Sequence, residues 1–141
     1  MSHSKLVSYG MTRIARIELP DDRTFSIVIE EEHAAAWEKA IYVFLLGDEI
    51  KRIGSSKGRL GGRMKSWSRD VTAALRGEKS PTPEWEAAAW RDCLKEHNGG
   101  EVYARVATIV TTPIGTFEAY MDEESVLINR HRPPLNRHKN R

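Results

Sequence analysis

The sequence predicts an α+β fold in which helices flank a small antiparallel β-sheet. Three observations lead to this class. β-Branched, partly alternating segments occur in pairs separated by short turns, which is typical of antiparallel hairpins. Other segments carry the start and stop signals of helices. The resulting order of elements, ββ-α-ββ-α-α-β-α, is that of a sheet covered by helices rather than of an all-helical or all-strand protein.

Length and composition place the chain among soluble proteins of one domain. It has 141 residues, of which 40% are hydrophobic and 30% charged, so we expect a single domain over residues 1–141. The longest apolar run is too short to span a bilayer, and the polar N-terminus lacks the core of a signal peptide. Cys93 is the single cysteine, which excludes an internal disulfide and a cysteine-based zinc site. We therefore expect a cytoplasmic protein without a membrane partner.

The first 39 residues predict a hairpin and a short helix. Thr12–Leu19 and Thr24–Glu30 are β-branched segments, and the turn between them begins at Pro20. This hairpin could extend the sheet, form a dimer contact or bind a partner. Glu31–Lys39 is Ala-rich, with acidic residues first and a lysine last, which suits a short helix and its dipole.

The next segment predicts a second hairpin and a helix. Ile41–Leu46 is continuously apolar and is expected to form a buried strand. Gly47-Asp48 forms a turn, and Glu49–Ile53 forms the next strand. A Gly- and Ser-rich loop is expected to begin at Gly54, and Leu60–Leu75 to form a helix.

The last part of the chain predicts two helices and a strand. A helix with Thr82 as its N-cap is expected to run to His97, and its large apolar side chains are expected to pack inside: Trp85, Trp90 and Leu94. Val102–Val110 is expected to form a strand and Phe117–Asn129 the final helix.

Charge is strongly segregated although the net charge is only +2. Seven basic residues and no acidic ones lie between Lys51 and Arg69, and five basic residues and no acidic ones lie between Arg130 and Arg141. Glycines in the first segment would let backbone N–H groups approach an anion closely. The pattern indicates a polyanion-binding protein; the alternative is a solvated basic loop and a disordered tail.

Glu124 lies on the inward stripe of the predicted last helix. At 100° per residue its direction falls among those of the apolar side chains Phe117, Tyr120, Met121, Leu127 and Ile128. An inward carboxylate is costly unless a cation or several donors meet it. Glu124 is therefore either a metal ligand or catalytic carboxylate, or a stripe-edge residue that reaches water or pairs with an arginine.

Four pieces of the sequence, in order, resemble the GIY-YIG nuclease family. They are Ala40-Ile41-Tyr42, Arg52-Ile53-Gly54-Ser55-Ser56-Lys57, Leu60-Gly61-Gly62-Arg63-Met64, and Glu124-Ser125-Val126-Leu127-Ile128 followed by Pro133, Leu135 and Asn136. The resemblance implies a GIY-YIG-like core over residues 40–136. Residues 68–100 would be a helical insertion, residues 1–39 lie outside the match, and residues 137–141 would be a basic tail.

The resemblance also implies roles for individual side chains. Tyr42 would activate the attacking water, Arg63 would contact the scissile phosphate, and Glu124 would hold the single metal ion, Mg²⁺ or Mn²⁺. Lys57 would be a second phosphate contact and Asn136 would help to hold the site together. Substrate binding would involve Arg52, Gly54, Ser55, Ser56 and Arg59, with Gly54 as a tight-turn glycine. From the residues alone, Tyr42 is better explained as a core aromatic on a buried strand, and the alternatives for Arg63 and Lys57 are solvated surface residues.

The family resemblance implies a divalent-metal-dependent endonuclease that hydrolyses DNA, with branched, damaged or otherwise structured DNA among the candidate substrates. The sequence departs from the family pattern at three positions. Ala40 replaces the first glycine, Arg52 replaces the second-motif tyrosine, and Trp67 stands where a histidine is common. Arg52 and Trp67 favour a second hypothesis, a catalytically weakened GIY-YIG-like module that binds nucleic acid.

Overall fold

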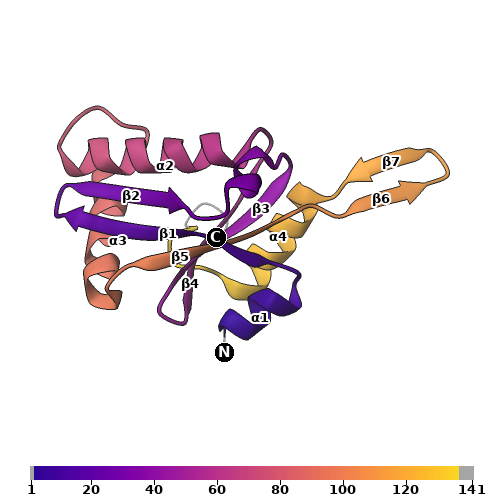
Figure 1. Ribbon diagram of the computed structural model, residues 1–141, viewed down its shortest axis with the longest axis horizontal. Helices are drawn as coiled ribbons and strands as arrows, with labels where there is room; N and C mark the ends of the chain where they lie inside the picture. The colour runs from indigo at the N-terminus through magenta and orange to yellow at the C-terminus, as the bar shows by residue number, and fades with distance from the viewer. Residues whose placement is uncertain (1, 137–141) are drawn as a thin grey trace.

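The computed structural model describes residues 2–136, and the basic tail predicted at residues 137–141 lies outside them. Seven strands are present in this range, which are β1 (Thr12–Asp21), β2 (Thr24–Ile29), β3 (Ala40–Leu46), β4 (Glu49–Ser56), β5 (Gly100–Val106), β6 (Ile109–Thr112) and β7 (Gly115–Glu118). The helices are α1 (Ser2–Ser8), the 3₁₀ turn η1 (Glu32–Ala36), α2 (Leu60–Leu75), α3 (Glu84–His97) and α4 (Tyr120–His131). Figure 1 shows that β6 and β7 project away from the rest of the molecule.

Five strands form one antiparallel sheet in the order β2-β1-β5-β3-β4. The predicted α+β class is therefore confirmed. The N-terminal hairpin extends this sheet, because β1 pairs along β5. Of the three possibilities that the sequence left open for the hairpin, the structure shows the first.

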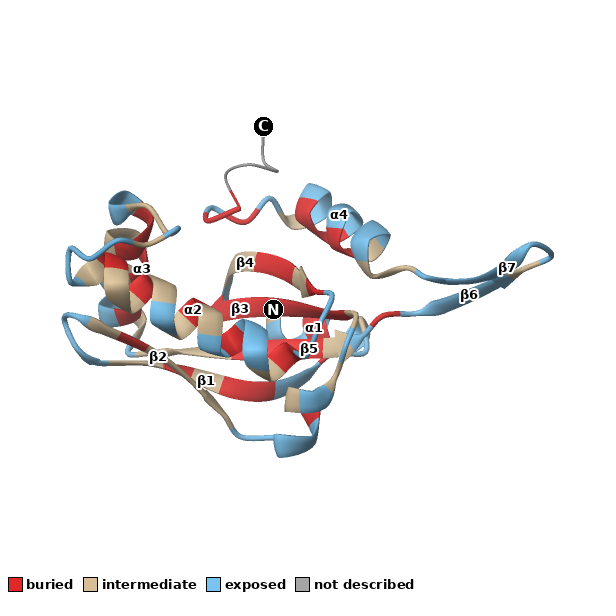
Figure 2. Cartoon of the chain, turned by 90° about the horizontal axis from the view of Figure 1, so that it is seen from above, coloured by how far each residue is buried: buried red, intermediate tan, exposed pale blue. Residues whose placement is uncertain are grey.

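Strand β3 is buried on both faces, which explains its continuous apolar sequence (Figure 2). Tyr42 and Phe44 point to a core that is shared with α2 and α3. Ile41 and Val43 point to a second core that is shared with α1 and α4. Helices α2 and α4 therefore lie on opposite faces of the sheet, and β4 forms the edge between them.

The prediction of one continuous strand over Val102–Val110 is wrong for its second half. Strand β5 ends at Val106, and the chain then leaves the sheet as the β6–β7 hairpin. The last helix accordingly begins at Tyr120 rather than at Phe117, which lies in β7. Phe117 and Met121 are exposed, whereas Glu124, Leu127 and Ile128 are buried. The inward stripe is thus narrower than predicted, but it still contains Glu124.

Smaller differences have local causes. Gly54 lies inside β4 and not in a turn, because the pairing with β3 continues to Ser56. The segment after β2 forms only a 3₁₀ turn, and Lys39 takes a positive φ of 54°. Helix α3 begins at Glu84 with Pro83 as its N-cap, one residue later than predicted.

Three further findings complete the comparison. Trp85 is exposed rather than packed, while Trp90 and Leu94 are buried as predicted. Helix α1 was not predicted; its Leu6 packs in the core beside α4. Over residues 2–136, no helix combines the length and the apolar character needed to cross a bilayer.

Candidate active site

The Tyr42 hydroxyl is the meeting point of two side chains from α2. Arg63 donates to it from Nε over 3.2 Å, and Trp67 donates from Nε1 over 2.9 Å. These donors are one helical turn apart, so both face β3. Tyr42 itself is fully buried. The phenol is thus a core aromatic whose hydroxyl is also a polar partner of Arg63.

Gly54 makes this arrangement possible. It lies opposite Tyr42 in the β3–β4 register. A Cβ at position 54 would lie 2.5 Å from both the ring carbon Cζ and the hydroxyl oxygen of Tyr42. Glycine is therefore required here for the close approach of an aromatic ring, and not for a turn conformation.

Arg63 is exposed, but the Nε of its guanidinium donates a hydrogen bond to the buried Tyr42 hydroxyl. Its pKa is raised above the usual value by Coulombic interaction with Tyr42, by the hydrogen bond to the phenol, and by the charges of Asp70 and Glu124; burial acts against them. The charge of Glu124 is thus one of those that favour the charged form of Arg63.

Glu124 belongs to the opposite face of the sheet from Arg63. It lies on α4, which packs against β4 and β3, and it is 8% exposed. Glu124 is thus buried, as its place on the helix predicted.

A hollow of about 280 Å³ lies where β4 meets the start of α2. We call it the loop hollow, and its walls include Ser55, Ser56, Lys57, Arg59, Arg63 and Ser66. The first turn of α2 has no acidic residue, so the positive end of the helix dipole adds to these cations. The structure therefore brings five predicted substrate or phosphate contacts into one basic hollow.

Arg52 lies beside this site in a second hollow of about 300 Å³, which shares Arg63 and Ser66 with the loop hollow. Its guanidinium is 5.1 Å from the centre of a Trp67 ring and donates to the Leu135 carbonyl over 2.7 Å. Among residues 2–136, its buried Nε has no hydrogen-bond partner. Arg52 is held in place by an aromatic face and a backbone oxygen.

Asn136 fixes the C-terminal segment to the edge of the sheet. Its side-chain amide accepts from the Ile53 N–H and donates to the Ile53 carbonyl, both over 2.7 Å. Leu135 adds a backbone bond to the Lys51 carbonyl. These hydrogen bonds give partners to backbone groups on the open edge of β4. Asn136 thus stabilises the strand that carries Arg52 and Gly54.

The set of possible metal ligands is small. In the described part of the chain, no group of three or more His, Cys, Asp or Glu side chains is arranged to hold a metal ion. Within these residues, a metal site built on Glu124 would therefore have at most one further ligand of these four types. Mg²⁺ suits such a site, because it keeps most of its water ligands and needs only one or two carboxylates.

Trp67 is the site residue whose role the sequence did not predict. In the sequence, Trp67 stood out only because it departs from the family pattern. Its position four residues after Arg63 was the available signal, since residues at this spacing share a helix face. The hydrogen bond to Tyr42 and the ring contact with Arg52 make it the link between β3 and β4.

Solved structures resemble most of the chain, whereas no family model and no curated protein sequence matches it. A mutant of bacteriophage T4 EndoII superposes with a TM-score of 0.64 at 20% identity, covering 94% of this chain and 96% of that one. The restriction endonuclease HPY188I in complex with product DNA superposes with a TM-score of 0.51 at 18% identity, covering 94% and 82%. Together with the five-stranded antiparallel sheet and its flanking helices, these likenesses show that the chain has a GIY-YIG-like nuclease fold.

Proposed function

We propose that this protein is a divalent-metal-dependent endonuclease that hydrolyses DNA phosphodiester bonds. The observation that carries the proposal is the position of Arg63. This one guanidinium bonds to the Tyr42 phenol, lines the basic loop hollow and interacts electrostatically with Glu124. The structural likeness to a restriction endonuclease with product DNA supports the same class of reaction.

The loop hollow fits a phosphate of the DNA backbone. Lys57, Arg59 and Arg63 supply cations, and Ser55 and Ser56 supply hydroxyl groups. Such contacts position a nucleic acid without reading its sequence. No acidic side chain lines this hollow, so a polyanion meets no like charge there.

Glu124 would hold Mg²⁺ or Mn²⁺. Its burial and its nearness to the Arg63 charge suit a carboxylate that meets a cation rather than bulk water. When bound, the metal ion supplies charge neutralisation at the phosphate and the leaving oxygen.

Arg63 would exchange partners during the reaction. In the structure its Nε is engaged with the Tyr42 hydroxyl. A phosphate in the loop hollow would draw the guanidinium toward itself, where it would stabilise the charge that develops on the phosphate; donors of this kind contribute about 3–4 kcal/mol. The same movement would free the Tyr42 oxygen from Arg63. As a phenolate, with its own proton already released to solvent, that oxygen could then accept the proton of the attacking water.

A second candidate function is a weakened module that binds nucleic acid without cutting it. The specific observation in its favour is that Tyr42 is 0% exposed while its hydroxyl already accepts two hydrogen bonds. Arg52 in the position of the family's second tyrosine points the same way. This module would keep the loop hollow and its salt-sensitive DNA binding.

Plasmid nicking tests the proposal. Wild-type protein should nick supercoiled DNA with Mg²⁺ or Mn²⁺ and not with EDTA. Glu124→Gln should abolish nicking but keep DNA affinity, measured by fluorescence anisotropy. Asp122→Asn is the matched control, because it removes an exposed carboxylate from the same helix. Equal cleavage in EDTA would refute the metal dependence.

The same assay separates the two candidates. The weakened module predicts DNA binding without cleavage in any divalent metal, and it predicts that Arg52→Tyr creates activity. Cleavage by the wild type that Arg52→Tyr leaves unchanged or reduces would instead support the endonuclease.

A further inference from the structure

The β6–β7 hairpin, Ile109–Glu118, is an arm that no other element of the described chain covers. Every residue of β7 is exposed, and so is all of β6 except Thr112 (Figures 1 and 2). The hairpin is a sheet of its own with two open edges. An isolated two-stranded hairpin is marginally stable in water, and open edges attract further chains.

The arm also concentrates apolar surface. Of nine large exposed hydrophobic residues in the described chain, seven lie between positions 106 and 126: Val106, Ile109, Val110, Ile114, Phe117, Met121 and Val126. Val110 and Phe117 are direct cross-strand partners on one face of the arm. Ile114 forms the tip and is 89% exposed. Such concentration in one segment marks an interaction surface.

Charge decides which kind of partner fits. No charged residue occurs from Val106 to Phe117, so the arm offers nothing to neutralise DNA phosphates. Glu118 and Asp122 follow and would repel a polyanion. An apolar protein surface is therefore the better match.

The root of the arm is held firmly. Ala107 donates to the Lys39 carbonyl over 2.9 Å, and Ala119 donates to the Thr108 carbonyl over 3.0 Å. Glu123 accepts from the Thr108 N–H over 2.9 Å and pairs with Arg105. The arm is thus presented in a fixed direction.

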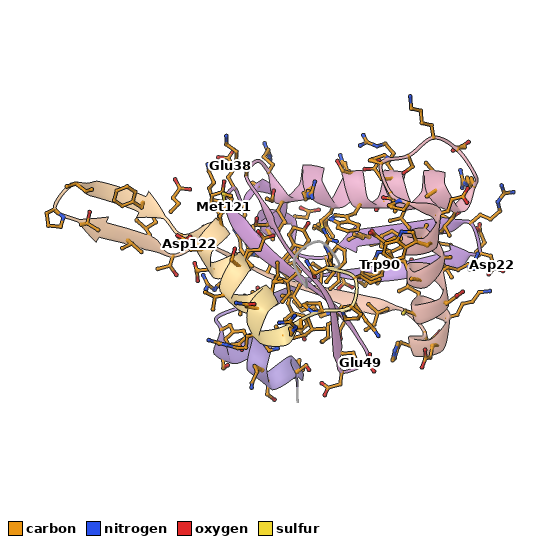
Figure 3. The ribbon with its side chains drawn as sticks, turned by 180° about the vertical axis from the view of Figure 1, so that it is seen from behind. Asp22, Glu38, Glu49, Trp90, Met121 and Asp122 are labelled. Atoms are coloured by element: carbon orange, nitrogen blue, oxygen red, sulfur yellow. The ribbon has the colours of Figure 1, made fainter. Side chains whose placement is uncertain are left out.

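A complementary surface lies at this root. A hollow of about 290 Å³ with a mostly apolar surface, here called the root hollow, opens between β5, α4 and the segment after α1. Tyr9, Val126 and Leu127 supply apolar wall, and the charged side chains around it include two of each sign: Arg105, Arg130, Asp122 and Glu123. Figure 3 labels Met121 and Asp122 where the arm joins α4. The arm projects away from α4 (Figure 1), so its tip cannot fill the hollow of its own chain.

We propose that the arm pairs two copies of this chain. Each copy has an apolar tip and an apolar hollow at the root of the same arm. Two arms that lie antiparallel across a twofold axis bring each Ile114 to the root hollow of the other copy and bury both Val110–Phe117 faces. This contact closes on itself, which is the requirement for a symmetric dimer. The dimer carries two copies of the candidate active site.

Molar mass in solution tests the dimer. Light scattering after gel filtration should give twice the 16.0 kDa of one chain. Ile114→Glu and Phe117→Glu should each halve the measured mass without changing the circular dichroism spectrum. Trp85→Glu, an equally drastic change at another exposed apolar residue, should leave the mass unchanged. A wild type that stays at one chain up to millimolar concentration overturns the proposal.

Cysteine crosslinking tests the contact itself. In a Cys93→Ser background, mixing Ile114→Cys chains with Val126→Cys chains should give a disulfide-linked dimer, which Val7→Cys in place of Val126→Cys should not give. The absence of this crosslink overturns the proposal. An Ile114→Glu variant that keeps its mass but binds DNA more weakly also overturns it, and would assign the arm to DNA instead.

Discussion

The Trp67 indole nitrogen lies 2.9 Å from the Tyr42 hydroxyl oxygen, and its ring lies under the Arg52 guanidinium. The tryptophan therefore connects a side chain of β3 with a side chain of β4. Arg63, one turn earlier on α2, bonds to the same hydroxyl. Two departures from the family pattern, Trp67 and Arg52, are thus in contact with each other. Each provides the environment in which the other is stable.

A double-mutant cycle should detect the bond between Trp67 and Tyr42. We expect Trp67→Phe and Tyr42→Phe to couple by about 1 kcal/mol in the free energy of unfolding, because each variant removes one partner of a buried hydrogen bond. The measurement is urea denaturation of the four proteins. Trp90→Phe with Tyr42→Phe is the control, because the buried Trp90 Nε1 has no partner among residues 2–136. Equal coupling in both cycles would contradict the assigned bond.

Gly54→Ala should destabilise the protein by about 1–3 kcal/mol, since the added carbon overlaps the Tyr42 ring and forces strand or side chain to move. The matched variant is Gly62→Ala. Nothing lies within 4 Å of a Cβ at position 62, and alanine is favoured over glycine in a helix, so stability should rise by up to about 1 kcal/mol. Thermal unfolding of both variants checks the pair. A neutral Gly54→Ala would show that the ring does not occupy this space.

The sequence predicted the elements that carry the candidate site better than the rest of the chain. Tyr42 and Arg63 lie in segments with strong local signals, so their strand and helix were placed correctly. Gly54 was placed one residue beyond its strand, which in fact continues to Ser56. Glu124 was identified by its position on a helix even though that helix begins three residues later than predicted. The apolar side chains around Glu124 were enough to predict that it faces inward. Glu124 lies inside the helix, so an error in the position of the first helical residue does not change the face on which it lies.

The arm and the edge contacts could not be predicted in this way. The residues 107–118 are β-branched and apolar, which is the composition of a buried strand, and local pattern does not show that they leave the sheet. The Asn136 pairing with Ile53 joins positions 83 residues apart. Such a contact depends on the path of the chain around β4, which no local signal records.

Lys57→Ala should weaken DNA binding to a similar degree for all sequences. It removes one cation from the loop hollow, so the slope of log affinity against log salt should fall by about 1. Lys95→Ala is the control, because Lys95 lies on α3, pairs with Asp22 in the β1–β2 turn and is outside the hollow. Fluorescence anisotropy over a salt series measures both slopes. Identical slopes for the two variants would remove Lys57 from the DNA contact surface.

His131 should make stability depend on pH. Burial, together with the positive charges of Lys5 and Arg130, lowers the pKa of His131 below its ordinary value of 6.5. The unfolded chain therefore takes up this proton before the folded chain does as the pH falls. The contribution of His131 to stability is complete above pH 6.5 and declines as the pH falls through 6.5 toward the lower folded pKa.

His131→Gln keeps a polar partner for the Tyr9 hydroxyl, which lies 2.9 Å from His131 Nε2, but removes the titration. Between pH 7.5 and pH 5, the urea midpoint of the wild type should therefore fall more steeply than that of the variant. At pH 7.5 the two midpoints should differ only by the change in the Tyr9 contact. Parallel curves over this range would show that His131 takes up its proton equally well in the folded and unfolded chains, and that α4 is not docked on α1 closely enough to exclude water from the ring.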